Sequence, residues 1–226
     1  MFKKPIPLIA WTLFIIVISS LITTAYFHVF VLNNNAKSAE VEEQAIRFVT
    51  AEQAEKSPIK EGNSIVEIFS YGCHFCAANE NNISELESRL PANSKLIRIH
   101  LSNGQNTGLA SYAPVFATLS VMGIEQKYRE SSYKAVIKSN INLSDQEQLK
   151  KWLQQNYIDV QEYEKASQSK ESKELLTYMT DISRYYNIKA TPVFIVNKKW
   201  LAMQDHDFAE FSNQLLSLLN NDKPLE

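Results

Sequence analysis

Two cysteines separated by two residues are the feature of this sequence with the clearest chemistry. Cys73, His74, Phe75 and Cys76 follow an apolar, β-branched segment and open a segment with helical spacing. Unpaired backbone N–H groups and the helix dipole stabilise a thiolate at the start of a helix. A thiolate is the attacking or leaving sulfur in thiol–disulfide exchange. The pattern therefore predicts a redox-active pair, with Cys73 as the reactive sulfur and Cys76 buried one turn further on.

Two other uses of the cysteine pair stay open. A purely structural disulfide across a two-residue gap closes almost no loop and adds little stability. A metal site would combine both cysteines with two of His74, His100 and His206, but the sequence has neither a second cysteine pair nor a closely spaced histidine pair. We expect no metal and no cofactor, and keep a copper carrier or a non-enzymatic chaperone as an alternative.

The predicted elements place the cysteine pair in one α/β domain. Short β-branched runs indicate strands, and apolar residues three, four or seven apart indicate helices. We expect strands at 46–50, 64–70, 95–101, 193–196 and 200–203. We expect helices at 73–90, 109–122, 125–139, 144–156, 159–167, 172–186 and 207–219. Ser144 and Asp159, each followed three residues later by a glutamate, are expected to cap two of these helices.

The N-terminal segment predicts a membrane anchor. A short basic start at residues 2–4 precedes a run without any charged side chain from Ile6 to Leu32. A spanning helix needs about 20 apolar residues, whereas the apolar core of a cleavable signal peptide has about 7–15. Lysines before the run and glutamates after it place the N-terminus in the cytoplasm. We expect an uncleaved signal-anchor, with cleavage after Ala25 as the alternative, and an exported domain in an oxidising compartment, the periplasm in a bacterium.

Composition excludes several other classes of protein. The 226 residues are 45% hydrophobic and 21% charged, which allows a sizeable core and argues against general disorder. A net charge of −2 does not suggest a nucleic-acid-binding surface. Only five glycines are present, and none forms a phosphate-binding loop.

A second element, Thr191-Pro192, directly precedes a late strand. A plain turn proline is the simpler interpretation, since proline often opens a strand. Together with the cysteine pair, however, it resembles the DsbA family of exported thiol:disulfide oxidoreductases in the thioredoxin superfamily. The resemblance covers residues 46–220 and rests on the segments 68–76 and 194–200, on Thr191-Pro192, and on the helical insertion between them.

The resemblance implies a thioredoxin fold interrupted by a helical domain that lies over the active site. It implies that Cys73 is the exposed nucleophile and Cys76 the resolving cysteine. It also implies a cis peptide bond at Pro192, stacked against the disulfide, and backbone pairing of Thr191 with bound substrate. A cis X-Pro bond is costly enough to be a deliberate feature.

Three charged residues also match positions of the family. Glu67 falls where the family keeps a buried acid below the disulfide, which implies a proton relay for Cys76. Arg98, on the neighbouring strand, falls where the family keeps the basic partner of that acid. Glu80 falls on an acidic position after the motif. A structural ion pair is the simpler interpretation of Glu67 and Arg98.

Two departures from the family pattern bear on redox tuning. The usual dipeptide between the cysteines is Pro-His, whereas here it is His74-Phe75. Phe75 has no N–H group to offer the Cys73 sulfur, and Thr191 stands where DsbA oxidases often have valine. Both departures argue against a strong oxidant, and Phe75 predicts a weaker oxidant than a Pro-His family member.

These observations predict a membrane-anchored, DsbA-like oxidoreductase made of five segments. The segments are a cytoplasmic start and transmembrane signal-anchor (1–32), a tether and first strand (33–63), a first thioredoxin half with the cysteine pair (64–102), a helical insertion (103–188), and a second half with the cis proline and C-terminal helix (189–226). The expected activity is the transfer of the Cys73–Cys76 disulfide to reduced or misoxidised exported proteins. The expected location is the inner membrane, single-pass, with the catalytic domain in the periplasm.

The expected redox partner is a quinone-linked oxidase of the inner membrane. One alternative is a reductase of the same fold, fed by a membrane reductant, for instance in cytochrome c maturation. Another is an isomerase, for which residues 33–63 are too few to form a dimerisation domain. No nucleic-acid partner is expected.

Overall fold

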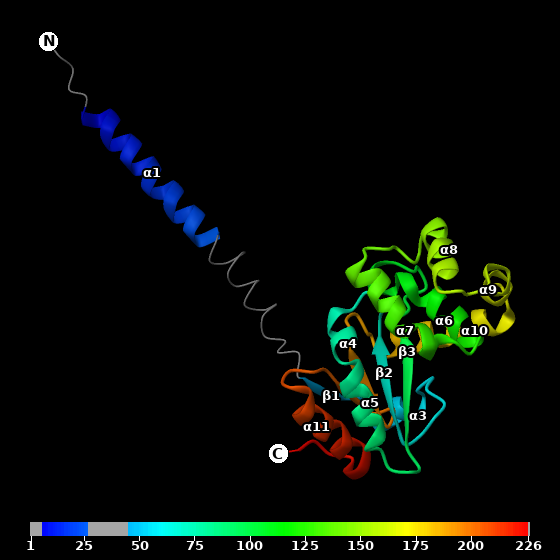
Figure 1. Ribbon diagram of the computed structural model, residues 1–226. Helices are drawn as coiled ribbons and strands as arrows, with labels where there is room; N and C mark the ends of the chain where they lie inside the picture. The colour runs from blue at the N-terminus through cyan, green and yellow to red at the C-terminus, as the bar shows by residue number, and fades with distance from the viewer. Residues whose placement is uncertain (1–5, 27–44, 226) are drawn as a thin grey trace. The chain divides into compact units, whose positions relative to one another are not determined.

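A computed structural model of the chain describes residues 6–26 and 45–225. The chain divides into two units, residues 1–44 and 45–226, which are described separately. In the first unit the structure describes one helix, α1 (Ile6–Tyr26) (Figure 1). The predicted basic start and most of the predicted tether lie outside the described residues. Within the described ranges, no helix meets both the length and the apolar character needed to cross a membrane. The anchor therefore stays a prediction.

The second unit is built on one mixed sheet of five strands in the order β1-β5-β4-β2-β3. The strands are β1 (Ile46–Phe48), β2 (Ser64–Phe69), β3 (Lys95–His100), β4 (Val193–Val196) and β5 (Trp200–Ala202). Strand β2 pairs parallel with β3 and antiparallel with β4, and each of its residues is buried. Three residues separate the end of this buried inner strand from Cys73.

The register of β2 brings its one charged residue beside a basic one. Glu67 pairs with Arg98 on β3 and with Phe194 on β4. Residues directly opposite each other on neighbouring strands project to the same face of a sheet, so their side chains can interact. Apart from Ser64 at its start, the remaining positions of the strand are hydrophobic, so Glu67 is the one acid of β2.

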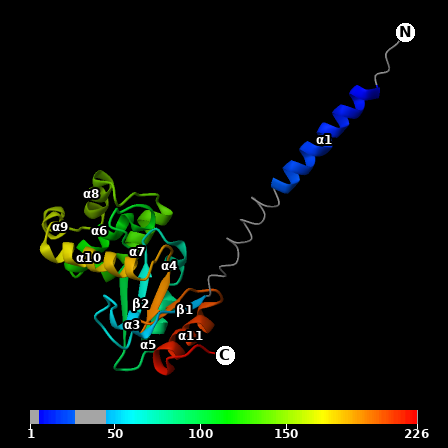
Figure 2. The same cartoon turned by 180° about the vertical axis from the view of Figure 1, so that it is seen from behind.

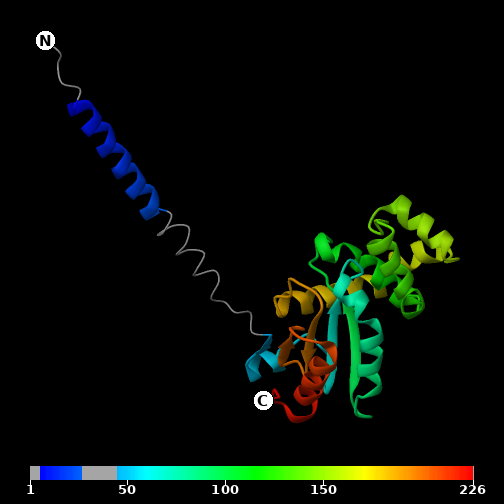
Figure 3. The same ribbon diagram turned by 60° about the vertical axis from the view of Figure 1, so that its left-hand side comes forward.

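Helices cover the sheet and extend beyond one end of it. One apolar core joins Ile65, Phe194 and Trp200 to the C-terminal helix α11 (Phe208–Asn221). A second core joins Val66 and other strand residues to the helical insertion. The insertion, drawn in green to yellow, lies beyond the same end of the strands in each view (Figures 1, 2 and 3).

The insertion contains the five predicted helical segments, with shifted bounds. They are η2 with α6 (Gly108–Tyr112, Ala113–Val121), α7 with η3 (Glu125–Tyr133, Lys134–Lys138), α8 (Gln146–Gln155), α9 (Val160–Ser167) and α10 (Lys170–Tyr185). The first begins as a 3-10 turn and the second ends in a π turn. Asp159 caps α9 as predicted, by accepting from the N–H of Glu162. The predicted cap at Ser144 is wrong, because Asp145 accepts the N–H of Gln148 instead.

Two further predictions, for elements before the insertion, are corrected. The single helix predicted over 73–90 is two helices, α4 (His74–Ala78) and α5 (Glu80–Ser88). They separate at Asn79, whose side-chain amide donates to Gln204 at 2.7 Å, a contact with a distant loop. The strand predicted over 46–50 ends at Phe48 and is followed by α3 (Ala51–Glu55). Thr50 and Gln53 form a capping box for this helix, a local signal that was present in the sequence.

Candidate active site

Cys73 occupies the N-cap position of α4. Its backbone is extended, at φ −95° and ψ 109°, while the next residue begins the helix. The Sγ of Cys73 accepts the backbone N–H of Cys76 at 3.0 Å. A charge-assisted hydrogen bond to a helix N-terminus favours the anionic form of the accepting group. The geometry therefore gives the Cys73 sulfur, rather than that of Cys76, the environment of a stabilised thiolate.

The two cysteines form a disulfide bond, with their Cα atoms 5.2 Å apart. Cys76 is fully buried, whereas 4% of Cys73 is exposed. The predicted order of accessibility is therefore present, but Cys73 is far less exposed than expected. One reason is the loop before β4, since the carbonyl oxygen of Thr191 lies 3.4 Å from the Sγ of Cys73.

The peptide bond between Thr191 and Pro192 is cis, as the resemblance implied. The same loop delivers the Thr191 carbonyl to the disulfide, so the proline loop and the start of α4 form one site. The hydroxyl Oγ1 of Thr191 is buried and has no hydrogen-bond partner among the described residues. The pairing of the Thr191 backbone with a bound substrate stays a prediction.

Glu67 is completely buried in β2, the strand that precedes the cysteine pair. Its Oε2 accepts from Nε of Arg98 at 2.5 Å, and its Oε1 has no hydrogen-bond partner within the described part of the chain. Burial raises the pKa of the Glu67 carboxyl, because the charged form loses water. The charge of Arg98 and its hydrogen bond act in the opposite direction and are the smaller effects. The predicted contact between Glu67 and Arg98 is confirmed, and the relay role stays a prediction.

Arg98 also binds Glu80, at the start of α5. Two guanidinium nitrogens of Arg98 donate to the two carboxyl oxygens of Glu80, at 2.9 and 2.6 Å. The guanidinium carbon lies 5.0 Å from the ring centroid of Phe69, so an apolar surface covers one side of the cation. Burial alone would lower the pKa of Arg98, but its hydrogen bond with Glu80 and the charge of Glu67 give a net rise. Arg98 therefore stays charged and joins two carboxyl groups.

The sequence interpretation missed a second ion pair next to Glu80. Arg129 on α7 binds the carboxyl of Glu125 through two nitrogens, and its third nitrogen lies 3.9 Å from Oε2 of Glu80. The hydroxyl of Tyr71 donates to Oε1 of Glu125 at 2.9 Å. A glutamate four residues before an arginine is an ordinary surface pattern on a helix. Nothing local in the sequence marks this pair as buried.

His100, a candidate metal ligand in the sequence, instead holds the loop that leads to Cys73. Its Nε2 accepts the backbone N–H of Tyr71 at 3.1 Å, and its Nδ1 lies 2.8 Å from the carbonyl oxygen of Leu101. Nδ1 must carry the hydrogen in this arrangement, because a carbonyl oxygen can only accept. Burial lowers the pKa of His100 to about 4, so the ring is neutral at neutral pH.

The two residues between the cysteines point away from the core. His74 is exposed, and Phe75 is 73% exposed in the first turn of α4. Their roles in redox tuning stay predictions. In the part of the chain that the structure describes, no group of three or more His, Cys, Asp or Glu side chains is arranged to hold a metal ion.

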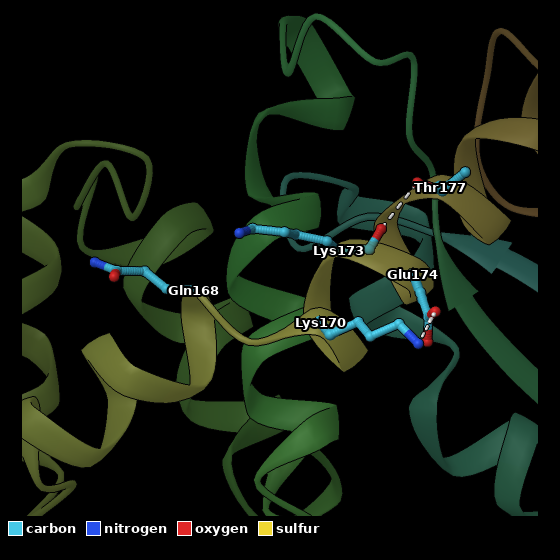
Figure 4. Close-up of a pocket in the computed structure, with 5 residues that line it drawn as sticks. All are labelled: Gln168, Lys170, Lys173, Glu174 and Thr177. Carbon is cyan, nitrogen blue, oxygen red and sulfur yellow. Dashed lines mark hydrogen bonds and ion pairs between the residues drawn. The ribbon is translucent and has the colours of Figure 1, made fainter.

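An open hollow elsewhere on the domain does not belong to this site. It lies along the start of α10 and is lined by Gln168, Lys170, Lys173, Glu174 and Thr177 (Figure 4). Lys170 pairs with Glu174 at 3.3 Å, so part of its charge is already satisfied within the helix. None of the residues around the disulfide lines this hollow, which leaves the disulfide and the proline loop as the candidate active site.

The chain is similar to known thiol:disulfide interchange proteins. The family model described as a DSBA-like thioredoxin domain matches residues 92–216. The thiol:disulfide interchange protein DsbA of Pseudomonas syringae pv. tomato is 24% identical over 166 residues, which cover 74% of this chain and 77% of that protein. The protein of the same name from Azotobacter vinelandii is 28% identical over 136 residues, which cover 60% of this chain and 63% of that protein.

Solved structures show the same fold. The crystal structure of Pseudomonas aeruginosa DsbA matches with a TM-score of 0.68 and 20% identity, over 80% of this chain and 93% of that one. The oxidoreductase NmDsbA1 from N. meningitidis matches with a TM-score of 0.65 and 22% identity, over the same shares. The predicted thioredoxin fold with a helical insertion is confirmed.

Proposed function

This chain belongs to the family of DsbA-like thioredoxin domains and is a thiol:disulfide oxidoreductase, and we propose that it introduces disulfide bonds into exported proteins. One observation carries the proposal. The Cys73–Cys76 disulfide lies at the start of a helix, with Sγ of Cys73 held between the N–H of Cys76 and the carbonyl oxygen of Thr191. This arrangement offers a substrate one defined sulfur to attack and a stabilised thiolate to release.

The reaction proceeds in two exchanges. A client thiolate attacks Sγ of Cys73, the bond between Cys73 and Cys76 breaks, and its electron pair stays on the Cys76 sulfur. A second client thiolate then attacks the client sulfur of the mixed disulfide and releases Cys73 as a thiolate. The client loses two electrons and gains a disulfide, and the enzyme is left with two reduced cysteines. The N–H of Cys76 stabilises the released Cys73 thiolate.

Glu67 exchanges a proton with the buried sulfur of Cys76. A thiolate at Cys76 has no water to stabilise it, because the residue is fully buried, so it must be protonated as it forms. The raised pKa of Glu67 lets this carboxyl hold a proton nearer to neutral pH than an exposed glutamate would. Oε1 of Glu67, without a hydrogen-bond partner among the described residues, is the oxygen on which that proton can sit.

A partner must reoxidise the enzyme after each turnover. The reduced pair holds two electrons that it can pass on only by another disulfide exchange, so the direct partner presents a disulfide of its own. A quinone-linked oxidase of the inner membrane is the class of partner that fits an exported, membrane-held enzyme.

We also propose that the N-terminal segment is an uncleaved anchor and that the catalytic domain lies in the periplasm. The support is the uncharged run from Ile6 to Leu32 behind a basic start. After cell lysis, washes in high salt and in carbonate should leave the protein in the membrane pellet. Release by carbonate, or a mature N-terminus at Tyr26, would contradict the anchor.

The redox state of the pair in living cells tests the proposed direction of transfer. Acid quenching followed by alkylation of free thiols should find Cys73 and Cys76 mostly as a disulfide if the protein is an oxidase. A mostly reduced pair would contradict the oxidase and favour a reductase or an isomerase. This is the second candidate because Phe75, which is exposed, and Thr191 both depart from the pattern of DsbA oxidases. Stoichiometric Cu(I) binding without thiol exchange would instead favour the copper carrier.

A further inference from the structure

Buried charges continue from Glu67 into the helical insertion. Glu67 contacts Arg98, Arg98 contacts Glu80, and Glu80 lies 3.9 Å from Arg129. Arg129 in turn binds Glu125. We call these five residues the charge network; its most exposed side chain is that of Glu80, at 27%. Its members come from β2, β3, α5 and α7, so it links the thioredoxin sheet to the insertion.

The far end of the network is nearly as enclosed as the near end. The side chains of Arg129 and Glu125 are only 16% and 8% exposed. Charges with so little water around them act on one another over longer distances than surface charges do. A change in charge at Arg129 is therefore felt at Glu80 and, through Arg98, at Glu67.

The network has three carboxyl groups and two guanidinium groups. It carries a net charge of −1 when all three carboxyls are ionised, and it is neutral when one of them holds a proton. Glu67 is the fully buried carboxyl of the three, and its Oε1 has no hydrogen-bond partner among the described residues. Glu80 and Glu125 each bind a guanidinium group through both carboxyl oxygens, whereas Glu67 binds one through Oε2 alone. Glu67 is therefore the member that takes up the proton.

We propose that Arg129 is a positioning residue that favours ionisation of the Glu67 carboxyl. Glu125 opposes this effect, because it neutralises the charge of Arg129. This rests on the proposed function, in which Glu67 exchanges a proton with Cys76. Arg129 touches neither the disulfide nor a substrate. It acts by offsetting the negative charge of Glu80, which otherwise makes ionisation of Glu67 harder.

The other groups that face Glu67 do not replace Arg129 in this role. Arg98 on β3 is shared between Glu67 and Glu80. Tyr133 on α7 lies close enough to feel the charges of Glu67 and Glu80, but burial and those charges raise its pKa, so it stays neutral. Arg129 is then the remaining charged residue that acts on Glu67. Its own partner, Glu125, can be altered separately.

Two single variants should move Glu67 in opposite directions. Arg129→Gln removes the positive charge, so the midpoint for titration of Glu67 should rise by about half a pH unit or more. Glu125→Gln leaves Arg129 unneutralised, so the same midpoint should fall. A role in packing alone cannot produce shifts of opposite sign from two partners of one ion pair.

Carboxyl-carbon NMR of the full-length oxidised protein in detergent micelles measures this midpoint directly. The signal that disappears in Glu67→Gln identifies the residue. Arg129→Lys keeps the charge and should stay close to the parent. If Arg129→Gln does not fold, the double variant Glu125→Gln/Arg129→Gln keeps an amide pair, and its midpoint should lie above that of Glu125→Gln. Unchanged midpoints, or equal shifts of the same sign in both single variants, would overturn the proposal.

The result is separable from the proposed function. Oxidation of a reduced client peptide by the parent protein tests the function without reference to Arg129. Opposite midpoint shifts together with absent client oxidation would leave the inference standing and refute the function. Normal client oxidation with no midpoint shift would refute the inference alone.

Discussion

The carbonyl oxygen of Thr191 lies 3.4 Å from the Sγ of Cys73, although the two residues are 118 positions apart in the chain. Antiparallel pairing of β2 and β4 explains this proximity. Ile68, near the end of β2, is the partner of Val193, the first residue of β4. The residues after β2 and those before β4 therefore meet at the same end of the two strands. This follows from the strand pairing and does not depend on the arrangement of the inserted helices.

Glu67→Gln should slow disulfide exchange in a pH-dependent way. The amide keeps the size of the carboxyl but cannot release or take up a proton, so the contribution of Glu67 to the pH profile should disappear. Stopped-flow oxidation of a reduced peptide from about pH 5 to about pH 8 measures this. Glu85→Gln, an exposed acid on α5, is the matched control and should behave like the parent. Equal profiles for Glu67→Gln and parent would refute the relay.

Phe75→His should make the protein a stronger oxidant. The imidazole adds a hydrogen-bond donor and, when protonated, a positive charge near the Cys73 thiolate, which the exposed Phe75 ring cannot supply. A fall of about one unit in the pKa of Cys73 corresponds to a rise of about 30 mV in reduction potential. Thiolate absorbance against pH and equilibration with glutathione measure the two quantities.

Phe75→Leu is the control for that substitution, because it removes the ring without adding a donor. It should leave both quantities near their parent values. If Phe75→His changes neither the Cys73 pKa nor the potential, the third position of the motif does not set the redox poise in this protein.

His100 should make the folded state sensitive to acid. Its pKa is about 4 in the fold, below the value of about 6.5 for an unfolded chain, so the unfolded state binds the proton more readily. This contribution to stability is complete above about pH 6.5 and is lost as the pH falls towards 4. The full loss is about 3 kcal/mol.

His100→Gln tests this sensitivity, because its amide can still accept from Tyr71 and donate to Leu101 but cannot titrate. Urea unfolding at several pH values between about 4 and about 7 should show a flatter pH dependence for the variant than for the parent. His74→Gln, at an exposed position, should keep the slope of the parent. The same slope in parent and His100→Gln would show that burial of His100 is not what links stability to pH.

Local patterns were sufficient to predict the existence of the strands and the position of the cysteine pair between a strand and a helix. Buried strands such as β2 and β4 appear as short β-branched runs, and a cysteine pair placed after one of them indicates a helix N-terminus. The pairing of Glu67 with Arg98 was expected from the family resemblance, and the strand register accounts for it.

Features that depend on distant contacts could not be predicted in this way. The break at Asn79 depends on Gln204, 125 positions later, and the position of the Tyr71 loop depends on His100. The Glu125–Arg129 pair has the spacing of a solvent-exposed ion pair, but tertiary contacts with Tyr71 and Glu80 help to enclose it.

Trapping of mixed disulfides tests the central claim, that exchange runs through Cys73, most directly. In cells that express Cys76→Ser, the Cys73 thiolate can attack a disulfide of a client or partner, and one sulfur of that disulfide leaves as a thiolate. No Cys76 thiolate is then present to resolve the mixed disulfide, so covalent complexes should accumulate and disappear on reduction. Cys73→Ser should trap far less, because Cys76 is fully buried and lacks the helix-start environment. Equal trapping by both variants, or trapping by Cys73→Ser alone, would contradict the account.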